Sequence, residues 1–139
     1  MNRKLAKKIV LGVAGLSLIF AVVQCARPGP ALEDVVGLYV SKPNNYILTL
    51  SAEKHYHLYL NTEGVLNEVA NGEFDFPNTF LGDPRLEFLN LITAISDDKV
   101  IPAQSDKVWT SFPMFYKWGR LGVTMYYDEL RYIEFVKQQ

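Results

Sequence analysis

Cysteine and histidine are almost absent from this chain of 139 residues, whose only cysteine is Cys25 and whose only histidines are His55 and His57. A single cysteine cannot form a disulfide within the chain. The sequence also has no legible Cys-His pair, Ser-His-Asp order or glycine-rich phosphate loop. Catalysis needs titratable groups that converge in a cleft, and few are offered here. We therefore predict a protein that is not an enzyme and binds no cofactor.

Acidic residues are missing from the start of the chain, where none precedes Glu33. The first eight positions instead hold a basic head, formed by Arg3, Lys4, Lys7 and Lys8. Because the whole chain has 14 basic and 15 acidic residues, the part after this head keeps 10 basic against 15 acidic residues, a net charge of about −5. A mildly acidic surface argues against nucleic acid and against anionic lipid headgroups as partners.

Charge is also absent from residues 9–23, an apolar run that ends at Gln24-Cys25-Ala26. A basic head followed by such a run is typical of an export signal. We therefore predict that residues 1–26 form a signal peptide or an N-terminal membrane anchor, and that residues 27–34 form a tether. Val22-Val23-Gln24-Cys25 resembles the bacterial lipobox, which implies lipidation of Cys25, although Gln24 stands where Gly, Ala or Ser is usual.

Two other fates of this segment stay open. Residues 9–26 would make a helix of roughly 27 Å, near the lower limit for an uncleaved membrane anchor. Ordinary cleavage would release a free protein, but the small residues that it needs fit poorly around Ala21 and Ala26. In all three cases the C-terminal body lies in the cell envelope, in the periplasm or outside the cytoplasmic membrane.

Alternation of apolar and polar residues dominates the body, residues 35–139. It is clear in residues 45–50 and 55–60, and such alternation indicates half-buried strands. Asn61-Thr62-Glu63-Gly64 suits a type I turn closed by a glycine bulge, which makes residues 55–60 and 65–70 an antiparallel hairpin. Asn71-Gly72 predicts another hairpin turn.

The second half of the body is less uniform. Asp83-Pro84 is a good helix start, and apolar residues follow at helical spacing, but alternation also fits, so both helix and strand stay open for residues 84–95. We predict a polar loop at 96–106, then short strands that are interrupted at Pro113. The body is thus mainly β, an antiparallel up-and-down barrel or sandwich of about eight to ten short strands.

These features resemble small bacterial envelope proteins with a lipocalin-like β-barrel. The resemblance covers residues 36–136 and is carried by Gly37-Leu38-Tyr39, the run of hairpins, Gly72-Glu73-Phe74 and an aromatic last strand. The tryptophan that usually follows the opening glycine of lipocalins is absent. The resemblance implies a membrane-tethered binding or stress-related protein rather than an enzyme.

Two polar clusters could carry chemistry. His55 and His57 would point the same way from one strand, and Glu68, Glu73 or Asp75 could add a third metal ligand. Glu73 and Asp75 share one face and could act in acid–base chemistry or line a sugar site. Two histidines and no second metal motif favour a solvated strand face instead, so we predict no metal site and no catalytic residue.

Aromatic residues are dense in the C-terminal third, and large rigid side chains are what binding surfaces use. An open barrel would place them in an apolar ligand pocket, and a collapsed barrel would leave them as a patch for a protein partner. The predicted binding residues are Trp109, Tyr116, Trp118, Tyr126, Tyr127 and Tyr132.

The sequence therefore predicts an exported, membrane-tethered β-barrel binding protein of the bacterial envelope. Its expected partners are the membrane, through the N-terminus, and a protein or an apolar small ligand, but not nucleic acid. The alternative is a periplasmic immunity or inhibitor protein that neutralises a secreted toxin or hydrolase. A small hydrolase that uses Glu73, Asp75 or His57 is the least favoured reading.

Overall fold

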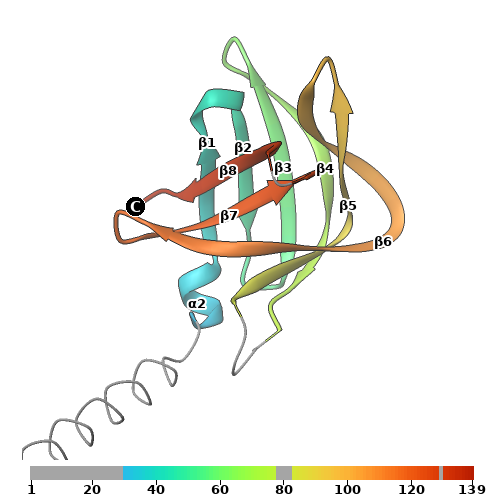
Figure 1. Cartoon of the computed structure of the whole chain (residues 1–139). Helices are drawn as coiled ribbons and strands as arrows, with labels where there is room; N and C mark the ends of the chain where they lie inside the picture. Colours follow the sequence, from blue (N-terminus) through green and yellow to red (C-terminus); the bar gives the residue numbers. More distant parts are fainter. Residues whose placement is uncertain (1–29, 78–82, 129) are drawn as a thin grey trace, which may run out of the picture. The chain divides into compact units, whose positions relative to one another are not determined.

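The computed structural model describes residues 30–77, 83–128 and 130–139, and these form a closed barrel of eight antiparallel strands in sequence order (Figure 1). The predicted up-and-down barrel is confirmed, at the lower end of the expected number of strands. A short helix and a 3₁₀ turn complete the fold. The elements are α2 (Leu32–Val35), β1 (Gly37–Ser41), η1 (Lys42–Asn44), β2 (Tyr46–Leu50), β3 (His55–Thr62), β4 (Val65–Asp75), β5 (Arg85–Ser96), β6 (Lys99–Lys117), β7 (Arg120–Tyr126) and β8 (Tyr132–Lys137).

Alternation along the strands fills the inside of the barrel with apolar side chains. In β8, for example, Ile133 and Phe135 are buried while their neighbours are not. Buried hydroxyl groups have partners: the Tyr39 hydroxyl donates to the Val35 carbonyl oxygen at 2.6 Å. The largest fully buried side chains are Tyr39, Tyr56, Phe74, Phe88, Phe112 and Phe135. The barrel is thus the collapsed kind, with a packed core rather than an open mouth.

Tight turns of the same kind close three hairpins. Glu63-Gly64, Asp97-Asp98 and Trp118-Gly119 are each two residues long and have positive φ at both positions. Two positive φ values are what a type I′ turn requires, and its twist matches that of the flanking strands. The hairpin of β3 and β4 is as predicted, but its turn is Glu63-Gly64 rather than a type I turn with a glycine bulge.

The helix considered for residues 84–95 is wrong, because this segment is strand β5. The pairing of β5 with β6 shifts between Leu89 and Leu91, where Asn90 has a φ of 67° and its Oδ1 accepts the Lys107 backbone N–H at 2.7 Å. At this irregularity residues 105–108 of β6 lie opposite Asn90 alone, and Asn90 shifts the alternation of β5 by one residue, so that Phe88 and Leu91 are both buried although they are three apart. The apparent helical spacing is the signature of the bulge.

The predicted hairpin turn at Asn71-Gly72 is also wrong, because β4 runs straight through it. Gly72 serves close packing instead: a Cβ atom there would lie 2.6 Å from the Leu89 carbonyl oxygen and 3.1 Å from the Tyr56 ring. The same carbonyl accepts the Tyr56 hydroxyl at 2.9 Å. A glycine inside a strand marks such a close approach as often as a turn.

Strand β6 replaces two predicted features. The polar loop at 96–106 is wrong: the chain turns at Asp97-Asp98 and β6 begins at Lys99. The predicted interruption at Pro113 is a change of partner, since β6 pairs with β5 up to Pro113 and with β7 from Met114 onward. Proline lacks a backbone N–H, and it lies where one ladder ends and the next begins.

The N-terminal segments predicted from the sequence are described only in part. Residues 1–26 lie outside the described residues, as does the beginning of the predicted tether, whereas Leu32–Val35 form α2. Val35 is fully buried, so α2 packs against the barrel. Within residues 30–77, 83–128 and 130–139, no helix has the length and apolar character needed to cross a membrane.

Alkaline pH is expected to destabilise the barrel through Tyr56. Burial raises the pKa of the Tyr56 hydroxyl from its ordinary value of 10.0 to about 12. The folded chain therefore holds this proton more tightly than the unfolded chain, so the stabilisation is complete below pH 10 and is lost as the pH rises through about 12. Urea unfolding at several pH values measures how the free energy of unfolding falls above pH 10. This fall should be shallower for Tyr56→Phe than for the unsubstituted chain, and equal falls in the two proteins would contradict the prediction.

Candidate functional site

Every aromatic residue that the sequence predicts to bind a partner is exposed. Trp118 is 90 % exposed and Tyr116 is 64 % exposed. Phe112 of β6 is buried, whereas Tyr116 near the end of the same strand and Trp118 in the turn after it are exposed. Exposed hydrophobic side chains that are scattered singly are ordinary on a protein surface, so the question is which of these aromatics lie together in a hollow.

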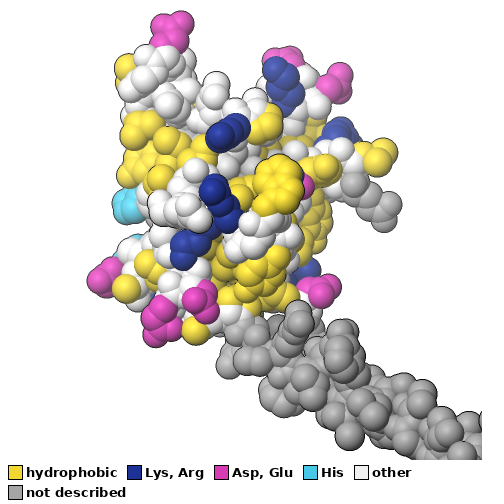
Figure 2. Space-filling view, turned by 90° about the vertical axis from the view of Figure 1, so that its left-hand side faces the viewer, with side chains coloured by type: hydrophobic (Ala, Val, Ile, Leu, Met, Phe, Trp, Pro, Cys, Tyr) yellow, Lys and Arg dark blue, Asp and Glu magenta, His cyan; other side chains and the backbone are white. Residues whose placement is uncertain are grey.

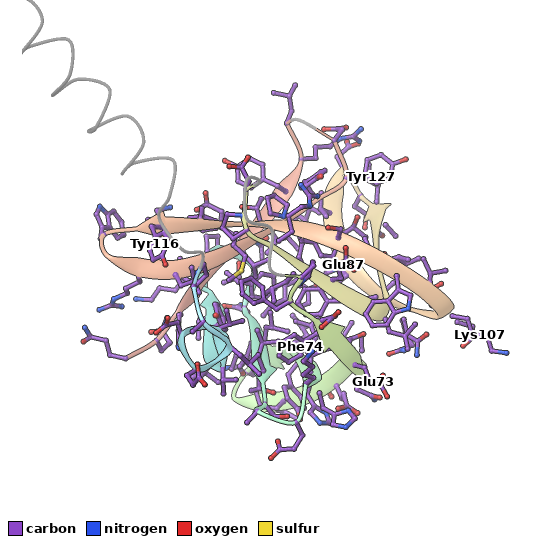
Figure 3. The ribbon with its side chains drawn as sticks, turned by 90° about the horizontal axis from the view of Figure 1, so that it is seen from below. Glu73, Phe74, Glu87, Lys107, Tyr116 and Tyr127 are labelled. Carbon is purple, nitrogen blue, oxygen red and sulfur yellow. The ribbon has the colours of Figure 1, made fainter. Side chains whose placement is uncertain are left out.

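These aromatics do not form one continuous surface. Figure 3 shows Tyr116 at one end of the β6–β7 hairpin and Tyr127 at the other. Tyr126 and Tyr127 have intramolecular partners: the Tyr126 hydroxyl accepts Arg85 Nη2 at 3.2 Å, and the Arg131 guanidinium lies 5.2 Å from the centre of the Tyr127 ring. Trp118 and Tyr132 are the predicted residues that line one groove together.

This groove, which we call the β8 groove, lies along β8 and has a volume of about 590 Å³. The beginning of β8 and its preceding loop form the floor. The end of β1 with η1 forms one wall, and the β6–β7 turn forms the other. The lining residues are Val40, Ser41, Lys42, Pro43, Asn44, Lys117, Trp118, Arg120, Leu130, Tyr132, Glu134, Val136 and Gln138.

The β8 groove has a basic rim around an apolar centre. Lys42, Lys117 and Arg120 line it, against the single carboxylate of Glu134. Lys117 Nζ pairs with Glu134 Oε2 at 2.5 Å, whereas Lys42 and Arg120 form no ion pair with any described residue. Figure 2 shows hydrophobic side chains gathered on this side of the barrel with Lys and Arg side chains beside them. The groove therefore suits a ligand with apolar and anionic groups, despite the acidic net charge of the chain.

Trp118 stands at a position that its local structure disfavours. It is the first residue of the two-residue turn between β6 and β7, with a φ of 52°. Asn, Asp and Gly are preferred at such positions, and a bulky residue there stores strain. Lys117 Nζ lies 5.5 Å from the centre of the Trp118 ring, and the Trp118 side chain is 90 % exposed. Strain and exposure together point to a role in recognition.

A second hollow lies beside Trp109, with a volume of about 420 Å³. It brings Trp109 together with His55, Glu73 and Asp75, which the sequence had singled out on one strand pair. Lys54 Nζ contacts Asp75 Oδ1 at 2.6 Å, and this hydrogen bond holds the pKa of Asp75 below its usual value. An ionised, lysine-paired carboxylate is a poor general acid, which argues against that role for Asp75.

The histidines lie on the solvent face of β3, as expected. His57 Nδ1 is 2.6 Å from Glu68 Oε1, and this hydrogen bond lowers the pKa of the Glu68 carboxyl. His55 lies opposite Glu73 in the register of β3 and β4. The two histidines thus have different carboxylate neighbours, and no group of three metal-ligating residues is found in the described part of the chain.

Part of the β8 groove escaped the sequence reasoning. Its η1 wall, Lys42-Pro43-Asn44, and the exposed side chain of Leu130 were not predicted to take part. Pro43 was the available sign in the sequence, because a proline favours the end of a strand and so indicates that β1 stops beside the aromatic strand β8.

Comparisons of the chain with protein-family models, with curated proteins and with solved structures gave no match. The functional conclusion consequently depends on the geometry of the β8 groove and on the N-terminal sequence.

Proposed function

We propose that this chain is an exported, membrane-tethered β-barrel protein of the cell envelope that binds a protein partner in the β8 groove without catalysing a reaction. The observation that carries the proposal is the exposed side chain of Trp118 at a strained turn beside two cations that have no ion pair with a described residue. The basic head and apolar run of residues 1–26, with Cys25 as a lipidation site, support the tether.

The packed interior favours a protein partner over an apolar small ligand. Lipid-type ligands of small barrels occupy the inside, and here fully buried rings such as Phe88 and Phe112 occupy it. The β8 groove is lined by exposed side chains such as Trp118 and Leu130 and lies outside this packed interior. Outer grooves with an aromatic anchor and a charged rim are typical of protein recognition.

A periplasmic immunity or inhibitor protein is the second candidate. An inhibitor of a secreted toxin or hydrolase also needs an external surface with a protruding anchor, and Trp118 at the tip of a hairpin meets that need. Cell killing by one particular secreted protein in the absence of this chain would favour this second candidate over a general binding role.

Photo-crosslinking tests the proposal. Benzoylphenylalanine replaces Trp118 in the full chain, in cells that naturally produce it, and the membrane fraction is analysed after irradiation. We expect one dominant protein adduct in that fraction. The matched control carries the same group at Val65, which is 60 % exposed but lies on β4.

Adducts that are equal at both positions would show that the β8 groove has no special role. Recovery of the chain in the soluble cytoplasmic fraction would contradict the proposed export and membrane tethering. Lipid that co-purifies with the chain in native mass spectra, without any protein adduct, would replace the protein partner by an apolar ligand.

A further inference from the structure

Strand β8 has a complete ladder on one side only. On the β7 side, five residue pairs join the strands, from Gly122 with Val136 to Tyr126 with Tyr132. On the β1 side, within the described residues, the ladder has two pairs: Tyr39 with Lys137 and Val40 with Val136. Residues 132–135 therefore pair with β7 on one side and with no strand on the other, where the end of β1 and η1 line the β8 groove.

The hydrogen bonds fix which backbone groups face the groove. Residues of an antiparallel strand direct their N–H and C=O groups to the two sides in alternation. The Gln138 N–H donates to the Leu38 carbonyl oxygen at 2.8 Å, toward β1, and the Tyr127 N–H donates to the Arg131 carbonyl oxygen at 2.9 Å, away from it. Even-numbered residues of β8 consequently face the β1 side.

Tyr132 and Glu134 thus direct their backbone groups into the β8 groove, beyond the last pair with β1. Strand β1 ends at Ser41, and the chain turns away through η1, where Pro43 has no N–H to offer and Asn45 has a φ of 58°. Figure 1 shows β8 crossing β1 at a steep angle, so that the two strands separate toward the start of β8. The result is a short open strand edge at the floor of a groove.

We propose that an extended segment of the partner protein adds to β8 as a further strand over residues 132–135. This inference rests on the proposed function and specifies the form of the partner. Four strand residues span about 13 Å, so a segment of four or five residues is enough. Main-chain hydrogen bonds to an exposed edge give affinity, and the neighbouring side chains select the sequence.

The side chains around the edge define the sequence of that segment. Lys42 and Arg120 lie on the two walls and suit carboxylate side chains, whereas Trp118 and Leu130 offer apolar surface. The added segment therefore carries both acidic and apolar side chains, and a basic segment is excluded by charge.

The test uses the full chain in detergent micelles and a random dodecapeptide library, depleted first against empty micelles. The recovered consensus peptide is synthesised and its affinity measured by fluorescence anisotropy. Tyr132→Pro and Tyr132→Ala both remove the ring, but only proline removes the N–H that faces the groove. Proline is tolerated at the first residue of a strand, and the β7 ladder does not use this N–H.

We expect an acidic and apolar consensus that binds about tenfold more weakly to Tyr132→Pro than to Tyr132→Ala, because one backbone hydrogen bond is lost. A second measurement leaves the protein unchanged: the consensus peptide is N-methylated at every second amide, in each of the two registers. One register should lose binding and the other should keep it.

Strand addition is overturned if no peptide is recovered, if the proline and alanine variants bind equally, or if both methylated registers bind alike. If the full chain forms a dimer that Tyr132→Pro converts to a monomer, then a second copy of the chain occupies the edge of β8. That result would overturn the proposal that a segment of another protein binds there. A protein adduct at Trp118 together with negative backbone tests would leave the proposed function standing and remove only strand addition. Loss of both the adduct and the peptides would remove the two together.

Discussion

Replacing Trp118 by Asn is expected to weaken partner binding by about 2 kcal/mol, ~30-fold in Kd, without lowering the free energy of unfolding. The side chain is 90 % exposed, so its removal leaves no cavity. Asn followed by Gly119 is also the preferred pair for a type I′ turn, so the strain at the φ of 52° is relieved. A residue retained for structure would give the opposite result, a loss of stability.

The measurement needs two readouts on the same variant. Affinity is measured for the partner captured by the crosslink at Trp118, and the free energy of unfolding is measured by urea titration. Val65→Asn is the matched control, since Val65 is an exposed apolar residue on β4, away from the β8 groove. Unchanged affinity in Trp118→Asn, or an equal loss in the control, would show that Trp118 is not the anchor.

Much of the fold follows from period-2 alternation. In β2, β3 and β8 the alternating residues predict both the strand and its buried face, because these strands pair regularly with one face on the core. The prediction failed where a regular pattern was locally broken for a tertiary reason. Asn90 shifts the alternation of β5 by one residue and so imitates helical spacing, and Gly72 allows a close approach instead of a turn.

The sequence predicts the type of residue at the candidate site, exposed aromatics, but not which of them lie together on the barrel. The density of aromatics in the C-terminal third indicates that some of them face outward, but alternation alone does not separate the exposed Trp118 from the buried Phe112, which share one face of the period-2 pattern. Alternation also does not show that Tyr126 is held by Arg85, or that Trp109 lies beside carboxylates of β4. Those neighbours are set by how strands distant in sequence meet around the barrel, which a local pattern does not contain.

The interior makes an equally sharp prediction at Phe88. Its ring is fully buried and lies 5.1 Å from the Tyr56 ring, edge to face, with the Phe74 and Phe112 rings at 6.3 and 6.0 Å. Phe88→Ala should lower the free energy of unfolding by about 3–5 kcal/mol, through lost burial and the cavity left behind. Urea unfolding followed by near-ultraviolet circular dichroism measures this loss.

The position of Phe88 gives that loss a wider consequence. Strands β4 and β5 are joined by Phe74 with Phe88 and Asp75 with Glu87 within the described residues, so the rings of Phe74 and Phe88 brace a short seam of the barrel. The free energy of unfolding of a small domain is roughly 5–15 kcal/mol in total, so Phe88→Ala should bring the barrel close to unfolding. Phe88→Leu keeps most of the side-chain volume and should lower this free energy clearly less. Two outcomes would show that the interior is not the packed core from which an external binding site was inferred. One is a loss of less than about 1 kcal/mol in the free energy of unfolding of Phe88→Ala. The other is an added apolar ligand that stabilises Phe88→Ala no more than it stabilises Phe88→Leu.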